Sequence, residues 1–125
     1  MEDIKKLVFD YVKAIGNQNE NDFKQLWSNK ENVLISIVKE FHGTDSIYQD
    51  FLIDTIQSHY ESIELVVEDI NIRLINDELG IVIFKYHTKC ILRDTKEPYG
   101  IEGLETQVVI KEDNKWKLVQ VHYSK

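Results

Sequence analysis

Hydrophobic residues recur every three to four positions in the first part of the chain, which predicts amphipathic helices. One such stripe runs over residues 4–15, and Gly16 would end this helix because glycine readily adopts the left-handed conformation of a helix C-terminus. A shorter stripe at residues 23–27 predicts a second helix, for which Asn19 or Asn21 can supply the capping side chain.

A short strand and a third helix are expected next. The β-branched run at residues 33–38 predicts the strand. Thr44 or Ser46 can cap the helix, and Asp45 in its first turn suits the positive end of the helix dipole. The apolar stripe is broad, so we expect this helix to be buried over much of its circumference. Its members are Tyr48, Phe51, Leu52, Thr55, Ile56 and His59.

The second half changes to the alternating period of β-strands. Four long strands are expected, at residues 63–75, 81–93, 99–112 and 116–123. The alternation changes parity near Val66 and Val67, which predicts a β-bulge in the first strand. In the second strand the odd-numbered positions are mixed and the even-numbered ones are apolar. The apolar face consists of Val82, Phe84, Tyr86, Thr88, Cys90 and Leu92.

Helices that precede an antiparallel sheet are typical of the α+β class. The chain shows no repeat and no linker, so we expect one domain over residues 1–125. Long strands joined by hairpins make a strongly twisted sheet, and the helices can cover its concave side.

Composition and charge exclude several partners without naming one. The 22 acidic residues outnumber the 15 basic ones, which gives a net charge of −7. Because phosphate affinity comes from Lys and Arg, we expect neither nucleic-acid binding nor attachment to an anionic membrane. The single cysteine, Cys90, excludes an internal disulfide. No apolar run reaches the ~20 residues of a membrane span, and the N-terminal residues lack a signal-peptide pattern, so a cytoplasmic location is expected.

Three segments carry a resemblance to a known family. Residues 11–15, which lead to 23–27, are similar to its opening helix pair, and residues 41–47 to its Gly-x-x-x-Ile helix start. Residues 116–124, Trp-Lys-Leu-Val-Gln-Val-His-Tyr-Ser, are close to its terminal strand. The chain thus resembles the SnoaL-like group of the nuclear-transport-factor-2-like superfamily, which includes ketosteroid isomerase and the kinase association domain.

The resemblance implies a cone-shaped fold with a pocket between a curved sheet and the helices, usually in a homodimer. The same scaffold carries isomerases, dehydratases, cyclases, hydrolases and non-catalytic assembly domains, so fold alone does not give the function. A mixed, partly apolar face on the odd positions of residues 81–93 also favours a homodimer formed through the sheet.

Ketosteroid isomerase offers a specific comparison, because it uses a carboxylate base, a tyrosine and a neutral carboxylic acid. Tyr11 falls where the tyrosine of that family would lie, and Glu105 is a loose match to the second acid. No carboxylate lies at residues 34–36, where the base would fall, so steroid isomerisation is not expected. The alternatives are a core tyrosine at position 11 and an exposed or ion-paired glutamate at position 105, and these interpretations stay open.

His122 lies in the most family-like segment and is a candidate general acid or base. The alternative is a structural histidine that contacts a neighbouring strand or an interface. Simple alternation groups it with Leu118 and Gln120 and opposite Val121 and Tyr123.

A set of aromatic residues on inward stripes can either line a pocket or fill a core, and these two interpretations also stay open. The set comprises Tyr11, Trp27, Tyr48, Phe51, Phe84 and Tyr86. The four histidines share no chelating spacing, and no phosphate loop or nucleophile elbow is present, so neither metal nor cofactor is expected. The segment from Gly100 to Gly103 is interpreted as a bulge.

The sequence therefore leaves three functions open. The chain can be an isomerase, lyase or hydrolase that uses Tyr11 with Glu105 or His122 on a small, largely apolar organic ligand. It can also bind such a ligand without catalysis, or act as an assembly domain.

Overall fold

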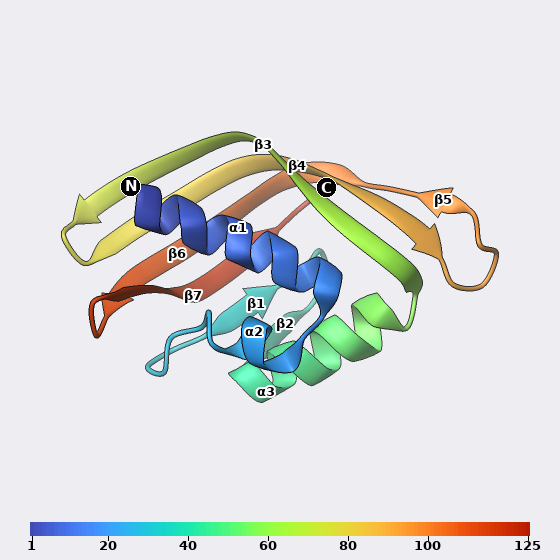
Figure 1. The fold of residues 1–125 in the computed structure, drawn as a ribbon, viewed down its shortest axis with the longest axis horizontal. Coiled ribbons are helices and arrows are strands. Elements are labelled where there is room, and N and C mark those ends of the chain that lie inside the picture. Colours follow the sequence, from blue (N-terminus) through green and yellow to red (C-terminus); the bar gives the residue numbers. More distant parts are fainter.

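One curled sheet encloses the first helix in the computed structural model, which describes residues 1–125. Figure 1 shows α1 lying across the inner face of the sheet, with β3 and β4 arching over it. The helices are α1 (Glu2–Asn17), α2 (Glu20–Lys24), α3 (Thr44–Ser46) and the π-helix η1 (Ile47–Gln57). The strands are β1 (Val33–Ile35), β2 (Glu40–His42), β3 (Tyr60–Asn76), β4 (Leu79–Leu92), β5 (Pro98–Tyr99), β6 (Glu102–Glu112) and β7 (Lys115–Tyr123).

The sheet has the strand order β2-β1-β7-β6-β4-β3, with β5 paired to β4 beyond the end of β6. All neighbours are antiparallel except β1 and β7, which run parallel. Helices on one side of a largely antiparallel sheet confirm the predicted α+β class. The four long strands were predicted, whereas β2 was not, because three residues carry too little alternation to be recognised.

The predicted stripe of α1 is confirmed and faces the sheet. Its buried members are Ile4, Leu7, Val8, Tyr11, Ala14 and Ile15. The helix ends one residue beyond Gly16, and Gln18 rather than glycine adopts the left-handed conformation with φ 58°. A Cβ on Gly16 would lie 3.3 Å from the carbonyl oxygen of Ile63, so this glycine allows α1 to approach β3 closely.

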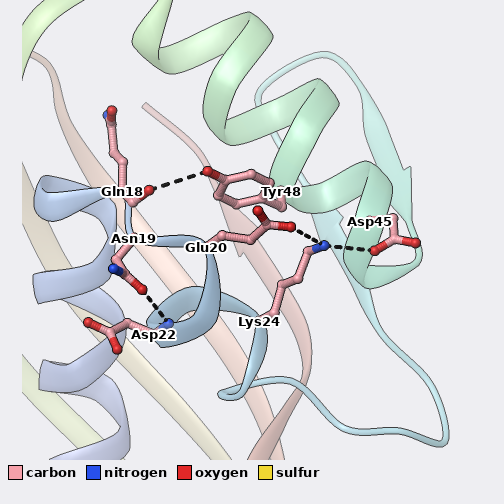
Figure 2. A network of polar contacts seen from close by, with 7 residues as sticks. All are labelled: Gln18, Asn19, Glu20, Asp22, Lys24, Asp45 and Tyr48. Atoms are coloured by element: carbon pink, nitrogen blue, oxygen red, sulfur yellow. Dashed lines mark hydrogen bonds and ion pairs between the residues drawn. The ribbon is translucent and has the colours of Figure 1, made fainter.

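Capping and ion pairs hold α2 against the start of the third helix (Figure 2). Asn19 is the N-cap, because its side-chain oxygen accepts a hydrogen bond of 3.0 Å from the Asp22 amide. The Lys24 ammonium lies 2.7 Å from Glu20 and 2.9 Å from Asp45, and it therefore links α2 to α3. The groups are mostly exposed, so these pairs fix orientation more than they add stability.

The third helix is a π-helix over most of its length, where the stripe predicted an α-helix. Its buried residues, Ile47, Phe51, Leu52 and Ile56, are spaced at four and five positions, which fits the wider turn of a π-helix. Neither Thr44 nor Ser46 caps the helix with its side chain as predicted, since no side-chain capping hydrogen bond forms and the residue before Thr44 is Gly43 with φ 89°.

The left-handed end of α1 contacts both ends of η1. Tyr48 donates a hydrogen bond of 3.4 Å to the backbone oxygen of Gln18, as Figure 2 shows. Gln57 Nε2 donates a bond of 2.9 Å to the side-chain oxygen of the same Gln18. These bonds hold η1 against the C-terminal end of α1.

None of the helices is long and apolar enough to cross a membrane.

The β-bulges differ from the prediction. The register of β3 against β4 shifts between Glu68 and Asn71, at Asp69 with φ 46°, and not at Val66. The prediction of a bulge at Gly100 was wrong, because β5 and β6 both pair with β4 in the same continuous register. The glycine is needed there for space, since a Cβ would overlap the carbonyl oxygen of Thr88.

Candidate functional site

A cavity of about 270 Å³ lies between η1 and the inner face of the sheet. Of its 18 lining residues, 13 are hydrophobic. The apolar wall includes Phe51 and Ile56 from η1, and Ile63, Leu65 and Ile101 from the sheet side. Ligand pockets of drug-sized molecules typically occupy about 300–1,000 Å³, so this cavity suits a small organic molecule.

Glu105 is the buried charged group of this cavity. It lies on β6, is 3% exposed, and accepts a hydrogen bond of 2.8 Å at Oε2 from Gln107 Nε2. Burial raises the pKa of Glu105 to about 7, and the hydrogen bond from Gln107 opposes that rise. No cation forms an ion pair with Glu105. The carboxyl therefore exists in both protonation states near neutral pH.

Three tyrosines surround this carboxyl. Burial and the charge of Glu105 raise the pKa values of Tyr11 and Tyr86, the latter to about 12. Burial and the charges of Tyr86 and Glu105 likewise raise the pKa of Tyr123. All three hydroxyls thus stay protonated at neutral pH and act as donors.

The three hydroxyls are not equally available to a ligand. Tyr86 donates a hydrogen bond of 2.7 Å to the backbone oxygen of Ser124. The hydroxyls of Tyr11 and Tyr123 line the cavity and have no partner among the protein atoms, so each can donate to a bound molecule.

The rim of the cavity is more exposed and carries positively charged and polar groups. Lys125 and His59 lie there, together with the partly exposed Ile37 and Tyr99. His59 Nδ1 lies 2.6 Å from the Thr55 carbonyl oxygen, which fixes the ring against η1. No group of three or more His, Cys, Asp or Glu side chains is placed to hold a metal ion.

The structure brings four of the predicted site residues together and separates the others. Tyr11, Glu105, Phe51 and Tyr86 all line the cavity. Trp27 and Phe84 are core residues, with the Trp27 ring edge-on to Tyr11 at 6.3 Å between centroids. Tyr48 lies at the far end of η1, where its ring is 5.5 Å from the Lys24 ammonium.

His122 lies on the outer face of β7, exposed and aligned with Ile35 and Thr106. Its predicted grouping with Leu118 was wrong, because the register of β6 against β7 shifts between Val108 and Val109. The shift leaves Leu118 buried and turns His122 away from the cavity.

Sequence reasoning missed Tyr123, Tyr60 and Thr88 as cavity residues. Tyr123 could have been found from the alternation along its strand, which places it on the same face as the apolar Val121 two positions earlier. Thr88 was placed on the apolar face of its strand but was not assigned to a site. Tyr60 carried no usable signal, since it stands at the junction of a helix and a strand.

A family model described as the SnoaL-like domain matches residues 4–125. The fold is also similar to a nuclear transport factor 2-like superfamily protein from Salmonella enterica serovar Typhimurium, with a TM-score of 0.91 and 23% identity over 98% of this chain and 88% of that one. Comparison with curated proteins by sequence found no match.

Two further solved structures share the fold at lower identity. One is the hexachlorocyclohexane dehydrochlorinase LinA-type3 from Novosphingobium barchaimii, with a TM-score of 0.87 and 11% identity over 98% of this chain and 83% of that one. The other is a protein with a cystatin-like fold from Caulobacter vibrioides, with a TM-score of 0.82 and 13% identity over 98% and 87%. At these identities the similarity shows a common fold.

Proposed function

The chain belongs to the SnoaL-like domain family, and from this premise we propose that it binds a small, largely apolar organic molecule and exchanges a proton with it through Glu105. The observation that carries the proposal is a carboxyl, 3% exposed and without a cation, on the wall of an otherwise apolar cavity. Such a carboxyl serves no packing purpose, whereas a pKa of about 7 suits a general acid or base at neutral pH.

The reaction class follows from the groups that face the cavity. As a carboxylate, Glu105 can take a proton from a carbon atom of the ligand. The Tyr11 hydroxyl can donate a hydrogen bond to an oxygen of the ligand on which negative charge develops. Return of the proton to another carbon completes an isomerisation, and departure of a leaving group with its electron pair completes an elimination. The fold shared with a dehydrochlorinase is compatible with the second outcome.

Proton exchange can be tested without the natural substrate by using cyclohexanone as the probe. We expect the protein in D₂O to exchange the α-protons of this ketone for deuterium faster than buffer does, as followed by loss of the proton NMR signal. Glu105→Gln should abolish the acceleration, because an amide cannot accept the proton. Glu102→Gln is the matched control, since Glu102 is exposed three residues earlier on the same strand.

The competing function is binding without catalysis, which the predominance of hydrophobic lining residues favours. It predicts that saturation-transfer NMR detects bound cyclohexanone while the α-protons exchange no faster than in buffer. Absence of both binding and exchange, with cyclohexanone and with larger cyclic ketones, would contradict the proposal that the cavity takes such ligands.

We also propose that a second copy of the chain covers the outer face of the sheet. Leu104 is 55% exposed and Ile83 is 37% exposed, and both lie on this face. They are diagonal neighbours, because Leu104 pairs with Lys85 and Ile83 pairs with Thr106. A two-fold contact places such a patch against itself and removes both side chains from water.

A cytoplasmic location is consistent with Cys90, which is a free, buried thiol.

A further inference from the structure

Gln107 is a fully buried polar side chain next to the carboxyl of the cavity. It lies two residues after Glu105 on β6, so both side chains point to the inner face of the sheet. Its cross-strand neighbours, Val82 and Val121, are completely buried valines. An amide in apolar surroundings gives up its hydrogen bonds to water, and this costs stability unless a partner replaces them. Packing alone would favour an aliphatic residue at this position.

Only one of the two polar atoms of the Gln107 amide makes a hydrogen bond. Nε2 donates to Glu105 Oε2 at 2.8 Å, whereas Oε1 is buried without a partner. A carboxylate can only accept hydrogen bonds, whereas a carboxylic acid also donates one. An amide has a donor on one side and an acceptor on the other. A half-turn of the amide would therefore exchange the group that it presents to Glu105.

We propose that Gln107 is a positioning residue that pairs with Glu105 in both of its protonation states. Its Nε2 holds Oε2 of the carboxylate, and after a half-turn of the amide its Oε1 accepts the hydrogen bond of the carboxylic acid. In the ligand-free protein, Glu105 Oε2 is then occupied in both states. Oε1 of the carboxylate is left to meet a ligand and to take its proton, while Nε2 of Gln107 stays on Oε2. The proposal rests on the proposed function only in treating Glu105 as the group that exchanges the proton.

The residue type at position 107 fits this task. An aliphatic side chain would pair with neither state, and lysine, which has no acceptor, would pair only with the carboxylate. A second carboxyl would repel the charged form of Glu105. Glutamine also reaches far enough along the strand to contact a side chain two residues away on the same face.

The test is a pH titration of the ligand-free protein by NMR. The side-chain NH₂ signals of ¹⁵N-labelled Gln107 and the carboxyl signal of ¹³C-labelled Glu105 are followed between pH 5 and 9. We expect both to shift with one common midpoint. Glu105→Gln should make the Gln107 signals independent of pH. Constant Gln107 signals in the parent while Glu105 titrates would overturn the proposal, and this measurement needs no variant to fold.

A variant provides the second readout. Gln107→Met keeps the length of the side chain but removes the hydrogen bonds to both forms of Glu105. The bond to the charged carboxylate is the stronger of the two, so the Glu105 midpoint should rise by about one pH unit. Gln120→Met is the control, because Gln120 lies half-buried outside the cavity, and its midpoint should equal that of the parent. An unchanged midpoint in Gln107→Met would contradict the proposal. Because no ligand is present, failure of cyclohexanone exchange would leave this result unaffected.

Discussion

The hydroxyl of Tyr86 donates a hydrogen bond of 2.7 Å to the backbone oxygen of Ser124. Tyr86 lies on β4 and Ser124 follows β7, so the bond joins the last residues of the chain to the wall of the cavity. The Ser124 amide in turn donates a bond of 2.9 Å to the carbonyl oxygen of Leu104. The two bonds fix the position of Lys125 on the rim.

Removal of this hydroxyl should loosen the rim. We expect Tyr86→Phe to lower the free energy of unfolding by about 1 kcal/mol, the usual contribution of one hydrogen bond. The Ser124 amide should also exchange faster with solvent deuterium. Urea denaturation and hydrogen exchange measure the two effects. Tyr123→Phe is the control, since its hydroxyl has no protein partner, and equal losses of stability in both variants would contradict this account.

Gly103 lies directly beneath the same chain segment. A Cβ there would overlap the Ser124 carbonyl oxygen and lie 2.8 Å from the Lys125 Cα, and backbone atoms cannot move aside cheaply. Gly103→Ala should therefore cost about 1–3 kcal/mol of unfolding free energy, as overpacking does elsewhere.

The matched comparison for Gly103 is Gly16→Ala. Its new Cβ would lie 3.3 Å from the Ile63 oxygen, a milder contact, and alanine favours a helix by up to about 1 kcal/mol over glycine. Urea denaturation of both variants tests the difference. If Gly103→Ala costs no more than Gly16→Ala, the close approach of the chain segment to Gly103 is wrong.

Strict alternation made β4 predictable from the sequence. Val82, Phe84, Tyr86 and Cys90 are buried, as their even positions indicated. The predicted inward stripe of α1 was confirmed for the same reason, since its period of 3.6 residues is local. These two elements supply Tyr11 and Tyr86 to the cavity.

Features that depend on two segments at once were not predictable. The register shift between Val108 and Val109 turns His122 outward. The sequence of one strand does not reveal where its register against the neighbouring strand shifts. The π-helical turns of η1 likewise do not follow from an apolar stripe alone. Whether aromatic residues leave a cavity or fill it depends on packing, which explains why Trp27 and Phe84 lie in the core.

The outer face of the sheet gives a prediction on the oligomeric state. We expect light scattering at micromolar concentration to give twice the monomer mass for the parent and a monomer for Leu104→Glu, because a charge would be buried in the contact. Leu74→Glu is the control, since Leu74 is 47% exposed but pairs with the buried Gly80 towards the helix side of the sheet. A monomeric parent, or dissociation of both variants, would contradict a dimer through the outer face.

The buried carboxyl should make stability depend on pH in a defined direction. Burial raises the pKa of Glu105 from 4.5 to about 7, so between these values the folded state holds a proton that the unfolded state has lost. The contribution of Glu105 to stability is therefore fully present below about pH 4.5 and is lost as the pH rises through about 7.

Replacement of this carboxyl by an amide removes the pH dependence that it causes. Relative to the parent, Glu105→Gln should gain up to about 3 kcal/mol of unfolding free energy between pH 4.5 and pH 8, since one pKa unit corresponds to about 1.4 kcal/mol. Urea denaturation of both proteins at several pH values measures the difference. Glu102→Gln should run parallel to the parent, because that carboxyl is exposed. If Glu105→Gln also runs parallel to the parent, the carboxyl is ionised throughout this range and is no proton-exchanging group at neutral pH.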